Sequence, residues 1–199
     1  MESALAGLAF GLSLIVAIGP QNTFVLVQGV RRRHVALVVG TCAVSDVLMI
    51  AVGVAGAGAV LGGRPLLGNV LTGAGVAFLL AYGALALRRA VRPSAVAVDG
   101  PAAQSWRAAL LTCLAFTWLN PGVYVDTVFL IGPVSHAHAG QRWAFAAGAM
   151  AASVAWFVGL GYGARLLAPA LGRPSAWRAL DAAVAGVMAL TAARLVAAF

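Results

Sequence analysis

Six apolar segments, each long enough to cross a lipid bilayer, occupy most of this 199-residue chain. A helix needs about 20 apolar residues to cross about 30 Å of hydrocarbon, because each residue adds about 1.5 Å. The segments cover residues 3–30, 35–63, 65–87, 108–141, 143–164 and 177–199. Only 9% of the residues are charged, against roughly 25% in soluble domains. The sequence therefore predicts an all-α integral membrane protein with six transmembrane helices.

The basic residues indicate the direction of these spans. All thirteen are arginines: ten lie in the gaps at 31–34, 88–107 and 165–178, and three lie at 64, 142 and 194. Cytoplasmic loops carry an excess of basic residues, so we expect the first group in the cytoplasm and both termini outside it. The net charge of +8 belongs to this pattern. Nucleic-acid binding is not expected, because a basic face with interleaved aromatic residues is missing.

We expect the chain to form a single transmembrane domain over 1–199, built from two halves. Three spans lie in a first repeat of about 1–88, a cytoplasmic loop covers 89–106, and three spans lie in a second repeat of about 107–199. Because three is odd, the second repeat would be inverted in the membrane. Breaks at corresponding places support this 3+3 inverted repeat: "GPQN" at 19–22 interrupts the first span, and "NPG" at 120–122 the fourth. Paired breaks in two halves indicate a central transport site.

Each break opens the helix backbone inside the membrane. Pro20 leaves the carbonyl of Val16 without a helical partner, and Pro121 does the same to Thr117. Such groups are tolerated only where they face protein or a water-filled cavity. A half-helix that ends there presents carbonyls, which suit an ammonium group, and one that begins there presents N–H groups, which suit a carboxylate. An amino acid carries both charges. A simple proline kink is the alternative, but it needs no Gln-Asn pair beside it.

Two aspartates, Asp46 and Asp126, lie inside apolar segments without a mid-membrane lysine or arginine. A charge at this depth is expensive and usually functional. Each is a structural carboxylate, a proton carrier, or a docking point for a cationic substrate. Cys42 lies one turn from Asp46, but without a nearby histidine no metal site is expected. Cys42 and Cys113 are expected to be small buried thiols, with no cofactor attached.

Four stretches carry a resemblance to a known family. These are "IGPQNTFVLVQGVRR", "CAVSDVLMIAVGVAG", "FTWLNPGVYVDTVFLIG" and "FAAGAMAASVAWFVGLGYGARLL". The chain resembles the LysE-type exporters of lysine and arginine over essentially its whole length. The resemblance implies substrate- or ion-binding roles for Gly19, Pro20, Gln21, Asn22, Asp46, Asn120, Pro121, Tyr124 and Asp126. Gly122 departs from the family, in which His or Asn often follows the proline.

The resemblance implies secondary active export of L-lysine and/or L-arginine across the bacterial inner membrane by alternating access. The driving force would be a proton gradient or the membrane potential. Partners would then be a cationic amino acid, coupling protons and membrane lipid, and a homodimer fits so small a transporter. Export of neutral amino acids or a divalent cation, and a passive channel, stay open as alternatives. Enzyme activity is not expected, because no protease or hydrolase motif is present.

Overall fold

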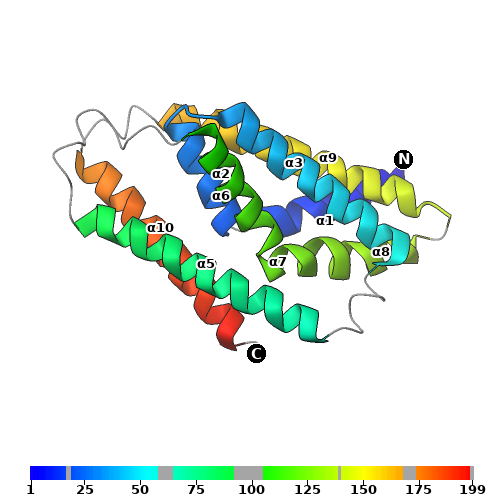
Figure 1. Ribbon diagram of the computed structural model, residues 1–199. Helices are drawn as coiled ribbons and strands as arrows, with labels where there is room; N and C mark the ends of the chain where they lie inside the picture. The colour runs from blue at the N-terminus through cyan, green and yellow to red at the C-terminus, as the bar shows by residue number, and fades with distance from the viewer. Residues whose placement is uncertain (17–18, 58–64, 92–104, 139, 168–173, 198–199) are drawn as a thin grey trace.

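The computed structural model describes residues 1–16, 19–57, 65–91, 105–138, 140–167 and 174–197, which are helical or lie in short turns (Figure 1). Short π-helical segments continue α3 and α7, and a 3₁₀ turn follows α9. The elements are α1 (Glu2–Ile15), α2 (Pro20–Val30), α3 (Val35–Val52), η1 (Gly53–Ala57), α5 (Pro65–Val91), α6 (Trp106–Trp118), α7 (Pro121–Tyr124), η3 (Val125–Ile131), α8 (Gly132–Ala137), α9 (Arg142–Gly163), η4 (Ala164–Leu167) and α10 (Pro174–Ala197).

Four stretches are long and apolar enough to cross a membrane as single helices: Val35–Gly56, Thr72–Val91, Arg142–Leu166 and Ser175–Ala197. Two bent pairs pass the same criterion together. The axes of α1 and α2 differ by 84°, and α6 meets the Pro121–Ala137 helix at 57°. The structure therefore has four to six candidate spans, and six if each bent pair is one span. Both bends lie where the prolines predicted breaks in the first and fourth segments.

The two bent pairs meet in the middle of the bundle (Figure 1). α1 packs along α9, α3 packs between α9 and α6, and α5 pairs with α10 on the other side. α5 continues to Val91, so the first residues of the predicted loop 89–106 are helical. Residues 92–104 of that loop lie outside the described residues.

Two apolar clusters fill the bundle, one on each side of the bends. The larger contains Phe24 of α2, Phe116 of α6 and Tyr82 of α5, whose rings have centroids 4.8–6.3 Å apart. The smaller contains Ile50 of α3 and Phe145 of α9. The clusters therefore leave the level of the two breaks free for polar side chains.

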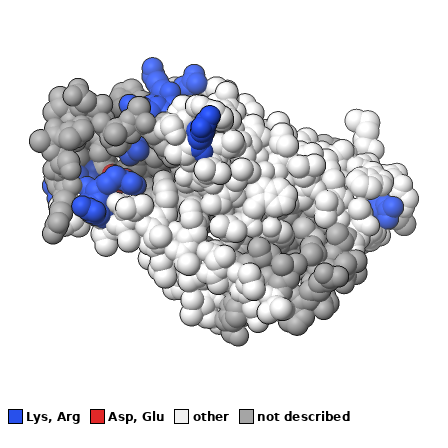
Figure 2. Space-filling view, viewed as in Figure 1, with Lys and Arg blue, Asp and Glu red and all other residues white. Residues whose placement is uncertain are grey.

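Arginines gather at the end of the molecule where α5 finishes and α10 begins, and far less at the opposite end (Figure 2). Here Asp181 accepts from Arg89 at 3.3 Å and lies 3.8 Å from Arg31. The Arg31 guanidinium also stacks on Trp177, 5.2 Å from the ring centroid. Burial lowers the pKa of Arg31, and the charge of Asp181 opposes that shift. This ion network ties α2, α5 and α10 together at the arginine-rich end.

Glycines set the closest helix contact. A Cβ on Gly148 of α9 would overlap the carbonyl oxygen of Ala4 in α1, whereas a Cβ on Gly159 of the same helix would meet nothing within 4 Å. We therefore expect Gly148→Ala to push α1 from α9 and to destabilise the protein by about 1–3 kcal/mol. Gly159→Ala is the matched control and should leave the thermal transition in detergent unchanged. Equal transitions for both variants would contradict this packing.

Candidate functional site

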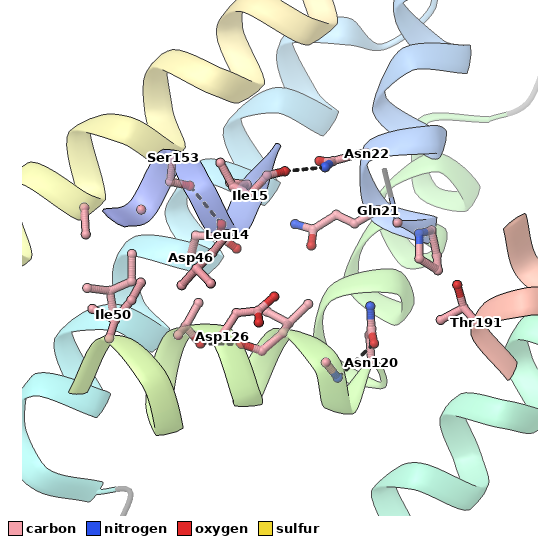
Figure 3. A pocket seen from close by; sticks show the side chains of 18 of the residues that line it. Leu14, Ile15, Gln21, Asn22, Asp46, Ile50, Asn120, Asp126, Ser153 and Thr191 are labelled. Carbon is pink, nitrogen blue, oxygen red and sulfur yellow. Dashed lines mark hydrogen bonds between the residues drawn. The ribbon is translucent and has the colours of Figure 1, made fainter. Parts of the chain in front are cut away.

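A cavity of about 250 Å³ lies between the two apolar clusters, where the two breaks meet (Figure 3). Its position follows from the helices around it. On α3, Asp46 lies between Ala43 of the larger cluster and Ile50 of the smaller one. On α9, Ser153 lies in the same way between Ala149 and Phe157. The polar and charged residues that line the cavity are Gln21, Asn22, Asp46, Asn120, Asp126, Thr127, Ser153, Thr191 and Arg194.

Asp46 is buried deep in this cavity, with only 5% of its surface exposed. The hydroxyl of Ser153 donates to its Oδ2 at 2.8 Å. Its Oδ1 makes no hydrogen bond with the described residues, and neither does Nε2 of Gln21, which is 8% exposed. The side chains of Gln21 and Asp46 point toward one another (Figure 3). A buried donor or acceptor without a hydrogen bond costs about 1–3 kcal/mol, so each atom is stabilised by a polar partner, either the facing side chain or a bound polar molecule.

Asp126 reaches the cavity from η3, on the side opposite Ser153 (Figure 3). It is half-buried rather than sealed. The ion pairs of the described residues all involve Asp181, so neither cavity aspartate is neutralised by a permanent cation within 4.0 Å. The two carboxylates therefore give the cavity an acidic interior.

At the first break, Asn22 closes the end of α1. Its Nδ2 donates to the carbonyl of Ile15 at 2.7 Å, and its Oδ1 accepts from Nε1 of Trp156 at 3.2 Å. Gly19 precedes α2 and supplies no side-chain cap to that helix. The carbonyl of Ile15 at this break is thus satisfied within the protein. The start of α2, with Gln21 in its first turn, faces the cavity instead.

At the second break, each end makes a hydrogen bond with a neighbouring side chain. Oδ1 of Asn120 accepts from the backbone N–H of Gly122 at 3.0 Å, and the Tyr124 hydroxyl donates to the carbonyl of Trp118 at 2.9 Å. A Cβ on Gly122 would lie 3.2 Å from that Oδ1, so the glycine leaves room for the cap. The two breaks therefore differ: the second is closed by its own residues, and the first is open toward the cavity.

The structure brings together most of the residues that the sequence suggested. The cavity lining includes Gly19, Pro20, Gln21, Asn22, Asp46, Asn120 and Asp126. Pro121 and Tyr124 do not line it, and Tyr124 serves as a helix cap.

Sequence reasoning missed Ser153, Thr127, Thr191 and Arg194, which also line the cavity. A single hydroxyl in an apolar helix carries little signal. Ser153 had one, because "GAMAAS" at 148–153 aligns with "GTCAVS" at 40–45. Among the described residues, three or more metal-ligand side chains never cluster closely enough to hold a metal ion.

Comparison with known proteins defines the class. A family profile described as "LysE type translocator" matches residues 12–198. The chain therefore belongs to the LysE-type translocator family of multi-pass membrane transporters, and it is not an enzyme. The family resemblance found in the sequence is confirmed.

Several relatives are similar over most of their length. The lysine exporter LysE of Corynebacterium diphtheriae is 37% identical over 98% of this chain and 99% of its own. The arginine exporter ArgO of Yersinia enterocolitica is 43% identical over 92% and 91%. A candidate amino-acid transporter of Mycobacterium tuberculosis is 47% identical over 89% and 88%. No solved structure matches.

The cap at Tyr124 predicts a structural effect. Tyr124→Phe removes the hydrogen bond to Trp118, and we expect a loss of about 1 kcal/mol in stability, seen as a lower melting temperature in detergent. The concentration of substrate that gives half-maximal transport should stay within about twofold of the wild-type value, because the hydroxyl lies outside the cavity. A large change in that concentration with an unchanged melting temperature would place Tyr124 in the site instead.

Proposed function

We propose that this amino-acid exporter moves L-lysine and/or L-arginine out of the bacterial cell, across the inner membrane. The observation that carries the proposal is the cavity at the two breaks, with Asp46 and Asp126 on its walls and no ion pair to either among the described residues. An acidic cavity in a low-dielectric surrounding favours a cationic cargo. The relatives named as lysine and arginine exporters support the same substrate class.

Asp46 and Gln21 form the deeper part of the proposed binding site. Oδ1 of Asp46 suits an ammonium or guanidinium group, and Nε2 of Gln21 suits a carboxylate or carbonyl oxygen. The start of α2 adds a partial positive charge beside Gln21. Asp126 offers a second carboxylate to the other cationic group of a basic amino acid. The same two carboxylates are our candidates for a coupling proton, because each takes up either a proton or a cation.

The arrangement of the core supports alternating access. The cavity is lined by residues beyond the breaks on the predicted outer side, such as Gly11, Ile131 and Thr191. On the predicted cytoplasmic side, the aromatic residues of the larger cluster and the Arg31–Asp181–Arg89 network fill the space. We therefore assign this structure to a state closed toward the cytoplasm. Export requires these inner contacts to open while the cavity closes outward.

Helix pairing supports the proposed inversion of the two halves. α1, the outer part of the first span, packs on α9 of the fifth, and α6, the inner part of the fourth span, packs on α3 of the second. α5 and α10, the third and sixth spans, pack on each other. An axis in the membrane plane would exchange these pairs. It would also keep both termini on the outer face.

The two aspartates provide the direct test. We expect Asp46→Asn and Asp126→Asn each to lower the efflux of labelled lysine and arginine from preloaded proteoliposomes by about tenfold or more, because each removes a charge-assisted contact. The matched control is Glu2→Gln, whose side chain is exposed on α1 and whose efflux should not change. Amounts of membrane-inserted protein are measured alongside. Normal basic amino-acid efflux by both aspartate variants would remove their proposed role.

A substrate panel separates the alternatives. Uphill efflux under an imposed proton gradient or potential distinguishes a pump from a passive channel. Efflux of neutral amino acids or of a divalent cation in place of lysine and arginine would reassign the cargo.

The first break predicts a second effect. Pro20→Ala restores a backbone N–H where α2 begins, which favours a continuous helix across the cavity. We expect transport to fall by about tenfold, with the protein still inserted in the membrane. Pro133→Ala is the control, because Pro133 also lies in the first turn of a helix but is exposed in α8. Equal transport by the Pro20 variant and the wild type would show that the break itself is dispensable.

A further inference from the structure

Among the described residues that line the cavity, Arg194 is the positively charged one. It lies on α10, one turn beyond Thr191, which lines the cavity as well. Within the described residues it has no carboxylate within 4.0 Å, because the ion pairs found there belong to Asp181. Arg194 as a residue is exposed rather than buried, so we place it at the edge of the cavity and not in the buried part around Asp46.

The charged residues that line the cavity come from different sides of it. α10 packs against α5 and α2, whereas α3, which carries Asp46, packs mainly against α9 and α6 and also contacts α2. Thr191 accordingly lies across the cavity from Asp46, beyond Gln21 and Asn120 (Figure 3). Arg194 therefore approaches from the side on which α2 begins. The acids and the arginine occupy different parts of the cavity wall.

We propose that Arg194 determines specificity by binding the α-carboxylate of the exported amino acid, an inference that rests on the proposed function. A basic amino acid carries two cationic groups and one carboxylate. The charged lining offers two carboxylates and one guanidinium, so each substrate charge has a counterpart of opposite sign. A guanidinium matches a carboxylate through two parallel hydrogen bonds. Nε2 of Gln21 points toward Asp46 and away from Thr191 (Figure 3), so Arg194 is the donor that we assign to the carboxylate end.

This role differs from anchoring at the membrane surface. Arg194 lies near the end of the last described helix, where a long basic side chain can extend to the interface. An anchor would affect insertion and stability but would treat all substrates alike. A carboxylate partner distinguishes ligands that differ only in that group.

The experiment compares ligands with and without the carboxylate. Purified protein in proteoliposomes is assayed for inhibition of labelled arginine exchange by L-lysine against L-lysinamide, and by L-arginine against agmatine. We expect the wild type to prefer each amino acid over its analogue by about tenfold. Arg194→Gln should reduce that ratio to about one, mainly by weakening the binding of the amino acid. Arg165→Gln, which removes an exposed arginine stacked on Tyr162 outside the cavity, should keep the wild-type ratio.

Arg194→Lys covers the case in which the Gln variant does not fold. The ammonium keeps the charge but lacks the planar fork, so the ratio should fall by about threefold. An unchanged preference ratio in the folded Gln variant overturns the proposal. If only the Lys variant folds, an unchanged ratio in that variant does the same. An equal loss of affinity for the amino acid and its analogue also overturns it. If the wild type moves neither lysine nor arginine, the proposed function fails. If it moves them and the ratios do not depend on Arg194, only this inference fails.

Discussion

The structure depends on one constraint: in hydrocarbon, a backbone N–H or carbonyl that lacks a partner is expensive, so a helix cannot end there without help. Pro20 and Pro121 each force such an end inside an apolar segment. Both ends lie at the same level of the bundle, between the two apolar clusters. The cavity lies where these ends meet, and its polar lining comes from the breaks together with side chains of the unbroken helices α3, α9 and α10.

The two breaks resolve this constraint in different ways, and the difference separates structure from function. At the second break, Asn120 and Tyr124 supply the missing partners. At the first, Asn22 serves the carbonyl end, but the start of α2 receives no side-chain cap. The asparagine of "GPQN" is thus a cap, and its glutamine is the residue that faces Asp46. Our proposed substrate site is accordingly centred on the first break.

Much of this was predictable because charge and proline are rare in membrane helices. Each stands out against an apolar background, so the spans, the breaks and both aspartates could be placed from the sequence. The sequence did not show which apolar residues face the lipid and which face the protein interior. On α3, Val44 is exposed and Cys42 is buried, yet both suit a helix in lipid, since lipid and protein interior are equally apolar. For the same reason, the sequence did not show that the hydroxyls of Ser153 and Thr191 lie at the cavity.

In the sequence, Arg194 was only one of the three arginines outside the cytoplasmic gaps, because its depth along the last segment is visible there and its direction is not. Packing of α10 on α2 turns it to the cavity. The same helix also extends to the arginine-rich end of the molecule. At its arginine-rich end, α10 carries Asp181, which holds Arg31 of α2 and Arg89 of α5. In the export cycle proposed above, opening toward the cytoplasm would separate Asp181 from Arg31, and a movement of α10 that does so would also move Arg194 relative to the cavity. We therefore propose that α10 couples the inner closure to the charge at the edge of the candidate site.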